Sequence, residues 1–260
     1  MEMKKSIGFI GGGRITKIFL KAFADSNTRF DEIAVFDPNE ENLQKLKKSY
    51  PDIQIESSKL DNAAKCDVLF VAVHPPVVMD VLSQIGPYLC ETSLVVSLAP
   101  KITTEKMMAA LNGFRAVARV NPSASGVIGQ GMNPVAFGAD VSDDHKAQLL
   151  SILSILGKAP IVDESKIEAY ALISAMGPTY FWFQLQQLEE LGVQFGMEEN
   201  EAKDVISEMM QGTVHTLFYS GIPSEEVMDL VPVKPIGEYE EIIKSYYTEK
   251  LNGIYAKIKP

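Results

Sequence analysis

The sequence predicts an α/β fold, with a doubly wound N-terminal domain followed by a smaller, all-helical C-terminal domain. In the first half, short apolar runs alternate with stretches of helical periodicity, which is typical of strands joined by crossover helices. The run Asp67–Val73 is apolar on both faces, as expected for a central strand of a parallel sheet. After Asp163 only helical periodicity remains, so we predict domains at residues 1–162 and 163–260.

Short apolar runs mark the predicted strands. They are Ser6–Ile10, Glu32–Asp37, 53–55, Asp67–Val73, Ser93–Ala99, Phe114–Val120, Pro134–Ala139 and Ala159–Asp163. Helices should separate them, one over residues 143–156, with right-handed crossovers. The helical stretches of the second domain are 167–191, 202–218, which ends at Gly221-Ile222-Pro223, and 239–258.

Composition and net charge exclude several classes of protein. A hydrophobic content of 46% and a charged content of 22% are those of a globular protein, and no run approaches the roughly 20 apolar residues of a membrane span. The net charge of -10 argues against a nucleic-acid partner. Cys66 and Cys90 are interpreted as buried free thiols in a reducing cytosol, and the three histidines lack metal-ligand spacing. We therefore expect a cytoplasmic protein without a metal site.

A glycine-rich turn follows the first strand in "GFIGGGRIT". In a dinucleotide fold, Gly11 would make the tight turn and Gly13 would let the backbone approach a pyrophosphate. The N–H groups at the helix start would then point at the phosphate oxygens. The third small residue of the pattern falls on Thr16, where glycine or alanine is usual, and this bulkier residue should push the helix slightly off the strand. The alternative is a turn that merely connects strand to helix.

Charged residues around the turn favour the dinucleotide. Arg14 and Lys17 lie in the first helical turn, where they oppose the helix dipole unless an anion is bound. Asp37 ends the second strand, near the offset at which an acidic side chain accepts from ribose hydroxyls. Asp37 would repel a 2′-phosphate, whereas Arg14 could pair with it. We predict NAD(H) or NADP(H) as the cofactor, with NAD favoured.

Further cofactor residues are expected where other strands end, because doubly wound sheets bind ligands at that edge. His74 would contact the nicotinamide ribose or cap the following helix, and both alternatives stay open. Lys101 would bind an anionic group or be an ordinary exposed lysine. The full predicted cofactor set is Gly11, Gly13, Arg14, Ile15, Asp37, Val73, His74, Pro75, Ala99, Asn121 and Pro122.

A Gly-Pro pair interrupts the apolar helical stretch in "ISAMGPTYFW". Proline in a helix interior costs about 3 kcal/mol, so Gly177-Pro178 needs an explanation. The break either frees N–H groups that bind a substrate carboxylate or is a kink tolerated for packing. The flanking stretch Tyr170–Leu191 is apolar on most sides, which indicates that a second subunit covers part of it.

Several segments resemble the pyrroline-5-carboxylate reductase family over nearly the whole chain. "IGFIGGGRI" resembles its cofactor turn, and "DVLFVAVHPPVVMDVL" resembles its Val-Lys-Pro strand end, with His74 in place of lysine. "VVSLAPKIT" is similar to Ser-x-Ala-Ala-Gly-x-Thr, and "ARVNPSASGVIGQG" to Arg-Val-Met-Pro-Asn-Thr-Pro-Ala. "VDE" and "ALISAMGPTYFWF" resemble Val-x-Glu and Gly-Ser-Gly-Pro-Ala-Tyr. The resemblance implies a Rossmann domain, a helical dimerisation domain, and a substrate pocket at the Gly-Pro break.

The chain departs from this pattern at the positions that the resemblance assigns to substrate. Met176 replaces the signature serine, and Glu238-Tyr239 aligns with a Thr-Thr pair. The resemblance thus implies a catalytic and substrate set of Met176, Gly177, Pro178, Glu238 and Tyr239. A Glu238 carboxylate would repel a substrate carboxylate, so either the loop is shifted or the substrate differs.

The resemblance implies an NAD(P)H-dependent reductase of a cyclic imine, of the kind that catalyses the last step of proline biosynthesis. Its partners would be a small molecule carrying a carboxylate and a second copy of the chain, with higher assembly left open. Two alternatives remain: a reductase of a different imine or carbonyl substrate, and a dimer that binds NAD(H) without turnover.

Overall fold

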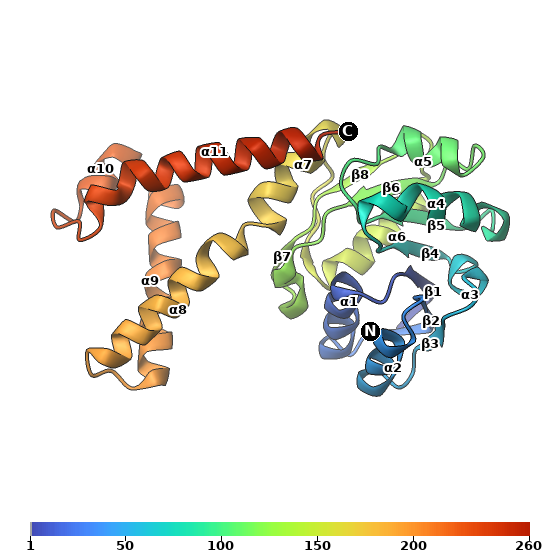
Figure 1. The fold of residues 1–260 in the computed structure, drawn as a ribbon, viewed down its shortest axis with the longest axis horizontal. Coiled ribbons are helices and arrows are strands. Elements are labelled where there is room, and N and C mark those ends of the chain that lie inside the picture. Colours follow the sequence, from blue (N-terminus) through green and yellow to red (C-terminus); the bar gives the residue numbers. More distant parts are fainter. Residues whose placement is uncertain (1) are drawn as a thin grey trace. The chain divides into compact units, whose positions relative to one another are not determined.

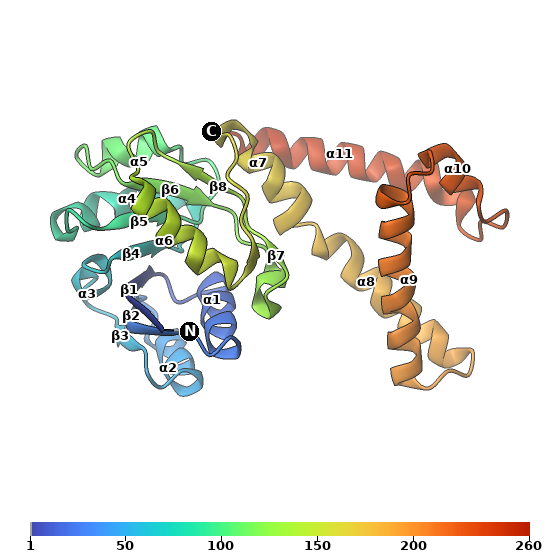
Figure 2. The same cartoon turned by 180° about the vertical axis from the view of Figure 1, so that it is seen from behind.

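The computed structural model describes residues 2–260, which form two compact units (Figures 1 and 2). The first unit runs to Met176 and includes Tyr255–Pro260, and the second is Gly177–Ile254. The predicted domain boundary at 162/163 stays a prediction, because the division into compact units follows Met176 instead.

A seven-stranded sheet in the order β3-β2-β1-β4-β5-β6-β8 forms the centre of the first unit. The strands are β1 (Glu2–Ile10), β2 (Arg29–Phe36), β3 (Gln54–Glu56), β4 (Val68–Val71), β5 (Leu94–Ser97), β6 (Val117–Val120) and β8 (Val135–Phe137). Neighbours from β3 to β6 are parallel, whereas β8 is antiparallel to β6. The order reverses between β1 and β4, so the predicted doubly wound class is confirmed.

Helices cover both faces of this sheet (Figure 1). The helices of the first unit are α1 (Arg14–Asp25), α2 (Glu40–Ser49), α3 (Asp61–Ala64), α4 (Pro75–Ile85), α5 (Thr104–Ala110), α6 (Asp143–Ser154) and α7 (Ile167–Tyr170). Buried residues of α1, α2 and α6 pack on one face, and those of α3, α4 and α5 on the other.

Phe9 of β1 anchors α1 to the sheet. Its ring stacks on Phe70 of β4 at 5.2 Å between centroids and meets Phe19 of α1 edge-on at 5.6 Å. All three side chains are fully buried. Such aromatic pairs stabilise beyond their buried area, and here they fix the helix that begins at the glycine turn.

The predicted strand over Ala159–Asp163 is wrong. The structure has an isolated parallel bridge between Val135 and Ile161, while β9 (Gly157–Lys158) pairs with β7 (Gly131–Met132) in a separate two-stranded sheet. Pro160 has no N–H to donate to a ladder, and its carbonyl accepts from Val135 N at 2.9 Å.

The second unit is helical, as predicted. Its helices are α8 (Pro178–Gln194), α9 (Glu199–Tyr219), α10 (Ser224–Asp229) and α11 (Glu240–Ile258), whose last residues belong to the first unit. A Cβ added to Gly192 of α8 would lie 3.2 Å from the Cβ of Ala202 on α9, so these helices pack closely. Beyond α9, Gly221 has a left-handed φ of +77°, which suits the predicted stop. Between Glu2 and Pro260, no helix combines the length and the apolar character that crossing a membrane requires.

Candidate functional site

The turn after β1 is held tightly against its neighbours. Gly11 has a φ of +107°, and its N–H donates to Phe36 O at 2.7 Å. A Cβ at Gly11 would lie 2.6 Å from the carbonyl oxygen of Ala72, just beyond β4. Only glycine fits this position without strain. The turn therefore lies where the ends of β1, β2 and β4 meet.

Asp37 belongs to the same cluster. Its Oδ2 accepts from Gly12 N at 2.7 Å, and its Oδ1 accepts from Asn39 N at 2.8 Å. An ionised carboxylate has about four acceptor positions, so about two remain for ribose hydroxyls. The structure thus brings Asp37 to the glycine turn.

The start of α1 is open to a ligand. Gly13 is the extended N-cap residue without a side-chain cap, and a Cβ there would meet nothing within 4 Å. Arg14 is exposed at the first helical position, followed by the half-buried Ile15. Thr16 is fully buried, and its hydroxyl donates to the carbonyl of Gly11. Threonine here therefore closes the turn with a hydrogen bond of its own.

Other predicted residues follow β4, β5 and β6 at the same edge. His74 is the extended N-cap residue of α4, directly before Pro75, and makes no side-chain cap hydrogen bond. His74 thus occupies the capping position of α4 without a capping hydrogen bond from its side chain, and its contact with the nicotinamide ribose stays a prediction. Val73 is half-buried, and Ala99 is buried beyond β5, where its N–H donates to Ser97 Oγ at 3.3 Å.

The loop after β6 is tied to the helix that follows it in the sequence. Asn121 is buried, and its Nδ2 donates to Ile167 O at 2.7 Å, so its side chain has a structural partner. Pro122 follows, and Ser123 Oγ donates to Ser174 O at 3.3 Å. These bonds hold the segment that leads to Met176 against the end of the sheet.

A buried ion network, which the sequence did not predict, lies beside this loop. Arg119 of β6 is fully buried and donates to Glu168 and, at 3.2 Å, to Glu164. The two carboxylates also accept from the α5 entrance, with Thr104 N 2.7 Å from Glu164 and Lys101 N 3.3 Å from Glu168. An arginine inside the apolar run "FRAVARV" was the available signal, because a buried guanidinium requires acidic partners.

The helical stretch does break before Gly177-Pro178. Residues Ala171–Ala175 form a π-turn, and Met176 N donates back to Ala171 O at 2.9 Å. Pro178 then occupies the first position of α8, where its missing N–H costs no helical bond. π-turns are frequent at functional sites.

The remaining predicted residues lie in the second unit. Glu238 and Tyr239 belong to a short 3₁₀ turn, Gly237–Tyr239, and both are exposed. Gly177 and Pro178 begin the same unit, whereas Met176 ends the first. The predicted substrate set is thus divided between the two units.

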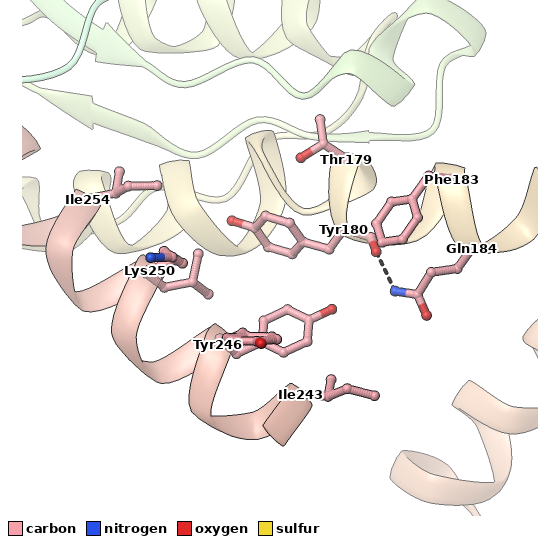
Figure 3. A pocket seen from close by; sticks show the side chains of 10 residues that line it. Thr179, Tyr180, Phe183, Gln184, Ile243, Tyr246, Lys250 and Ile254 are labelled. Carbon is pink, nitrogen blue, oxygen red and sulfur yellow. Dashed lines mark hydrogen bonds between the residues drawn. The ribbon is translucent and has the colours of Figure 1, made fainter. Parts of the chain in front are cut away.

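The second unit also contains an apolar cavity of about 480 Å³ between α8 and α11 (Figure 3). Tyr180 meets Tyr247 edge-on at 5.7 Å between ring centroids, and burial raises the pKa of the Tyr180 phenol. Other lining residues are Thr179, Phe183, Gln184, Ile243, Tyr246, Lys250, Leu251 and Ile254.

The residues of the first unit fit a dinucleotide. The close approach at Gly11 makes the tight turn, the open N-cap at Gly13 leaves space for a pyrophosphate, and Asp37 retains acceptor capacity. This combination of tight turn, helix start and acidic strand end is the dinucleotide fingerprint in its expected context.

Comparisons with known proteins agree with this geometry. The family model "NADP oxidoreductase coenzyme F420-dependent" matches residues 6–101, and "Pyrroline-5-carboxylate reductase dimerisation" matches residues 164–254. The chain is 30% identical over 224 residues to pyrroline-5-carboxylate reductase of Corynebacterium melassecola, covering 85% of this chain and 83% of that protein. For the Escherichia coli enzyme the identity is 27% over 230 residues, covering 88% and 85%.

Solved structures show the same fold. The Plasmodium falciparum pyrroline carboxylate reductase with NADP bound has a TM-score of 0.78 at 19% identity, covering 98% of this chain and 95% of that one. The Coxiella burnetii pyrroline-5-carboxylate reductase has a TM-score of 0.70 at 23% identity with the same coverage. The chain belongs to the pyrroline-5-carboxylate reductase family, and it carries that family's dimerisation domain.

Proposed function

From its membership of the pyrroline-5-carboxylate reductase family, we propose that this protein is an NAD(P)H-dependent reductase of the cyclic imine pyrroline-5-carboxylate. The observation that carries the proposal is the turn at Gly11, whose φ of +107° and contact with Ala72 accommodate only glycine. A turn that merely joined strand to helix would not need so close an approach. The relatives named above are reductases of this imine.

The residues of the first unit would hold and orient the coenzyme. Gly13 and the following N–H groups would bind the pyrophosphate, with Arg14 beside it, and Asp37 would accept from the adenosine ribose. Val73, His74, Pro75, Ala99, Asn121 and Pro122 would flank the nicotinamide half. When bound, the reduced nicotinamide supplies the hydride, and the protein supplies orientation and electrostatics.

NADH is the proposed coenzyme in preference to NADPH. Asp37 lies within hydrogen-bond distance of the glycine turn, where its charge would repel a 2′-phosphate. Arg14 is exposed one residue beyond Gly13 and would partly offset that repulsion.

The residues of the substrate site are also part of the proposal. Met176, Gly177, Pro178, Glu238 and Tyr239 occupy the positions that family resemblance assigns to substrate. Glu238 is an exposed carboxylate where the family has threonine, which favours a modified carboxylate site or a related imine or carbonyl as substrate. A substrate of this second class would differ from pyrroline-5-carboxylate in its acid group. The hydride would still come from the reduced nicotinamide.

A homodimer and a cytoplasmic location are part of the proposal. Residues 164–254 match the dimerisation domain, and apolar side chains such as Trp182, Phe183 and Phe218 are exposed on the second unit. The prediction that both cysteines are buried is right for Cys66 and wrong for Cys90, which is exposed. Two free thiols suit a reducing compartment.

The test is oxidation of NADH and of NADPH with pyrroline-5-carboxylate, with binding of both coenzymes measured in the same preparation. We expect turnover, faster with NADH at equal concentration. Coenzyme binding without turnover would reject this substrate and leave the two alternatives, a reductase of another imine or carbonyl and an NAD(H)-binding dimer.

Gly13→Asp provides a matched variant for this test. Aspartate is a favoured helix N-cap residue and a Cβ has space at Gly13, so the fold should be retained or stabilised. Its carboxylate would repel a pyrophosphate, and we expect coenzyme affinity to fall at least tenfold. Unchanged affinity would show that the dinucleotide binds elsewhere.

A further inference from the structure

Lys101 has an unusual backbone conformation. Its φ is +74°, and the other two non-glycine residues with positive φ among residues 2–260 are Asn27 and Asn112. Asparagine tolerates the left-handed region because its side chain bonds locally, whereas lysine has no such compensation. In the family motif Ser-x-Ala-Ala-Gly-x-Thr, which "VVSLAPKIT" resembles, this position is glycine. Strained backbone positions that the surrounding structure maintains cluster at functional sites.

Buried charges hold Lys101 in this conformation. Its N–H donates to Glu168 Oε1 at 3.3 Å, and Glu168 is 2% exposed and paired with the fully buried Arg119. On the far side of the turn, Thr104 N and Oγ1 donate to Glu164 at 2.7 and 2.9 Å. The network therefore fixes the backbone of Lys101 while leaving its side chain out of the ion pairs.

The strand that Lys101 follows indicates which part of the candidate coenzyme and substrate site its side chain would face. It follows β5, and β5 lies beyond β4 on the opposite side of β1 from β2 and Asp37. If Asp37 after β2 holds the ribose and the start of α1 holds the pyrophosphate, the nicotinamide half of a dinucleotide would be held by residues after β4 and β5. The coenzyme phosphates would then be bound away from Lys101. An anion near Lys101 would therefore come from the substrate.

The Lys101 ammonium is available to such an anion. The side chain is exposed, and among the side chains that the structure describes no carboxylate lies within ion-pair distance of its Nζ. Glu168, which accepts from the Lys101 N–H, is engaged by Arg119, and Glu164 is engaged by Arg119 and Thr104. In a chain of net charge -10, a fixed cation at this edge favours the approach of an acidic substrate.

We propose that Lys101 binds the carboxylate of the substrate at the nicotinamide end of the site. The assignment rests on the proposed function, since it names the group that recognises the acid of the cyclic imine. It gives this chain a carboxylate-binding cation on the first unit, at a position where its relatives' motif has no side chain.

The test compares Lys101→Met and Lys101→Gly with the wild type and with Lys106→Met, an exposed lysine of α5. For both Lys101 variants we expect the KM for pyrroline-5-carboxylate to rise at least tenfold, while the KM for NADH stays within twofold. Lys101→Gly should also raise the melting temperature, because glycine relieves the left-handed strain. Lys106→Met should leave both KM values unchanged.

A second readout isolates the carboxylate. Inhibition by L-proline and by L-prolinamide, which has an amide in place of the carboxylate, is measured for each protein, and we expect the wild type to bind the acid at least tenfold more tightly. Lys101→Met should lose that preference. A wild type that turns over the imine, with the same preference in Lys101→Met, would overturn the role of Lys101 alone. A wild type without turnover would instead reject the proposed function, and this assignment with it.

Discussion

The two compact units of this protein differ in how they bury their apolar side chains. In the first, Phe9, Phe19 and Phe70 are fully buried between sheet and helices. Within Gly177–Ile254, all of which the structure describes, Ala202 is the single hydrophobic residue in the buried class. Phe183 is 67% exposed in the second unit, although its neighbours on α8 are also apolar.

This difference in burial indicates that the two units have separate functions. The first unit has the core and the hydrogen-bonded loops of a self-sufficient coenzyme domain. The second has helices whose apolar side chains are exposed, and exposed apolar surface on this scale marks an association site. The comparison predicts that disrupting association should affect the second unit and spare the first.

The largest effect should come from Phe183→Glu, which places a carboxylate in the wall of the α8–α11 cavity. We expect the proposed dimer to weaken about a thousandfold, or roughly 4 kcal/mol, because aromatic side chains at interface centres contribute most of the binding energy. Light scattering after gel filtration measures the mass. Gln186→Glu, on the same helix but away from the cavity lining, is the control. A Phe183→Glu dimer at micromolar concentration would contradict the assignment of this surface.

Arg119→Met should have the largest effect on the first unit. It leaves the buried Glu168 carboxylate without its cation, and breaking such a pair costs about 3–5 kcal/mol. Urea unfolding gives the free energy directly. Arg115→Met is the matched control, because Arg115 pairs with Asp140 at the surface and such pairs contribute about 0–1 kcal/mol. Equal losses in the two variants would show that burial of Arg119 carries no energetic weight.

Gly11→Ala and Gly13→Ala separate folding from coenzyme binding within one turn. At Gly11 a methyl group meets the Ala72 carbonyl in a left-handed backbone, so we expect a loss of about 1–3 kcal/mol in stability. At Gly13 the methyl group has space, so stability should hold while NADH affinity falls. Melting curves and NADH titrations distinguish the two. A stable Gly11→Ala protein would mean that the turn relaxes.

Asp37→Asn tests the coenzyme preference. Removing the charge should weaken NADH binding about tenfold, roughly 1.4 kcal/mol, and strengthen NADPH binding. Asparagine retains an acceptor for Gly12 N, so the fold should remain. The ratio of the two dissociation constants is the measurement, with Asp31→Asn as an exposed control on β2. A ratio that does not move would remove Asp37 from the coenzyme site.

The sequence allowed the first unit to be predicted further than the second. Alternation of apolar runs and helices fixes the sheet class, and strand ends share an edge, so Gly11, Asp37 and His74 could be grouped without coordinates. The Arg119 network escaped prediction because Glu164 and Glu168 are 45 and 49 residues away along the chain. The prediction of a strand over Ala159–Asp163 was wrong because an apolar pattern reflects side-chain character only. It does not show that Pro160 lacks the N–H that a strand ladder needs.

Prediction of the substrate set was limited for a physical reason. Glu238 and Tyr239 were aligned to a family motif, and their effect depends on what surrounds them in the assembled protein. Both are exposed in the single chain, on the unit whose apolar faces also lack cover. Their roles therefore depend on association, which a single sequence encodes only through exposed apolar side chains.

The smallest effect that we expect is a difference in thiol reactivity between Cys66 and Cys90. It is also the most direct test of the comparison between the two units. Burial raises the pKa of the Cys66 thiol to about 12, whereas Cys90 is exposed. The thiolate is the reactive form, so at pH 8 iodoacetamide should label Cys90 and leave Cys66 almost unmodified. In monomeric Phe183→Glu the same selectivity should persist, because Cys66 belongs to the core of the first unit. In Arg119→Met, Cys66 should become reactive at lower urea concentrations than in the wild type. Mass spectrometry of the labelled peptides gives both answers, and rapid labelling of Cys66 in the native monomer would show that the first unit depends on association after all.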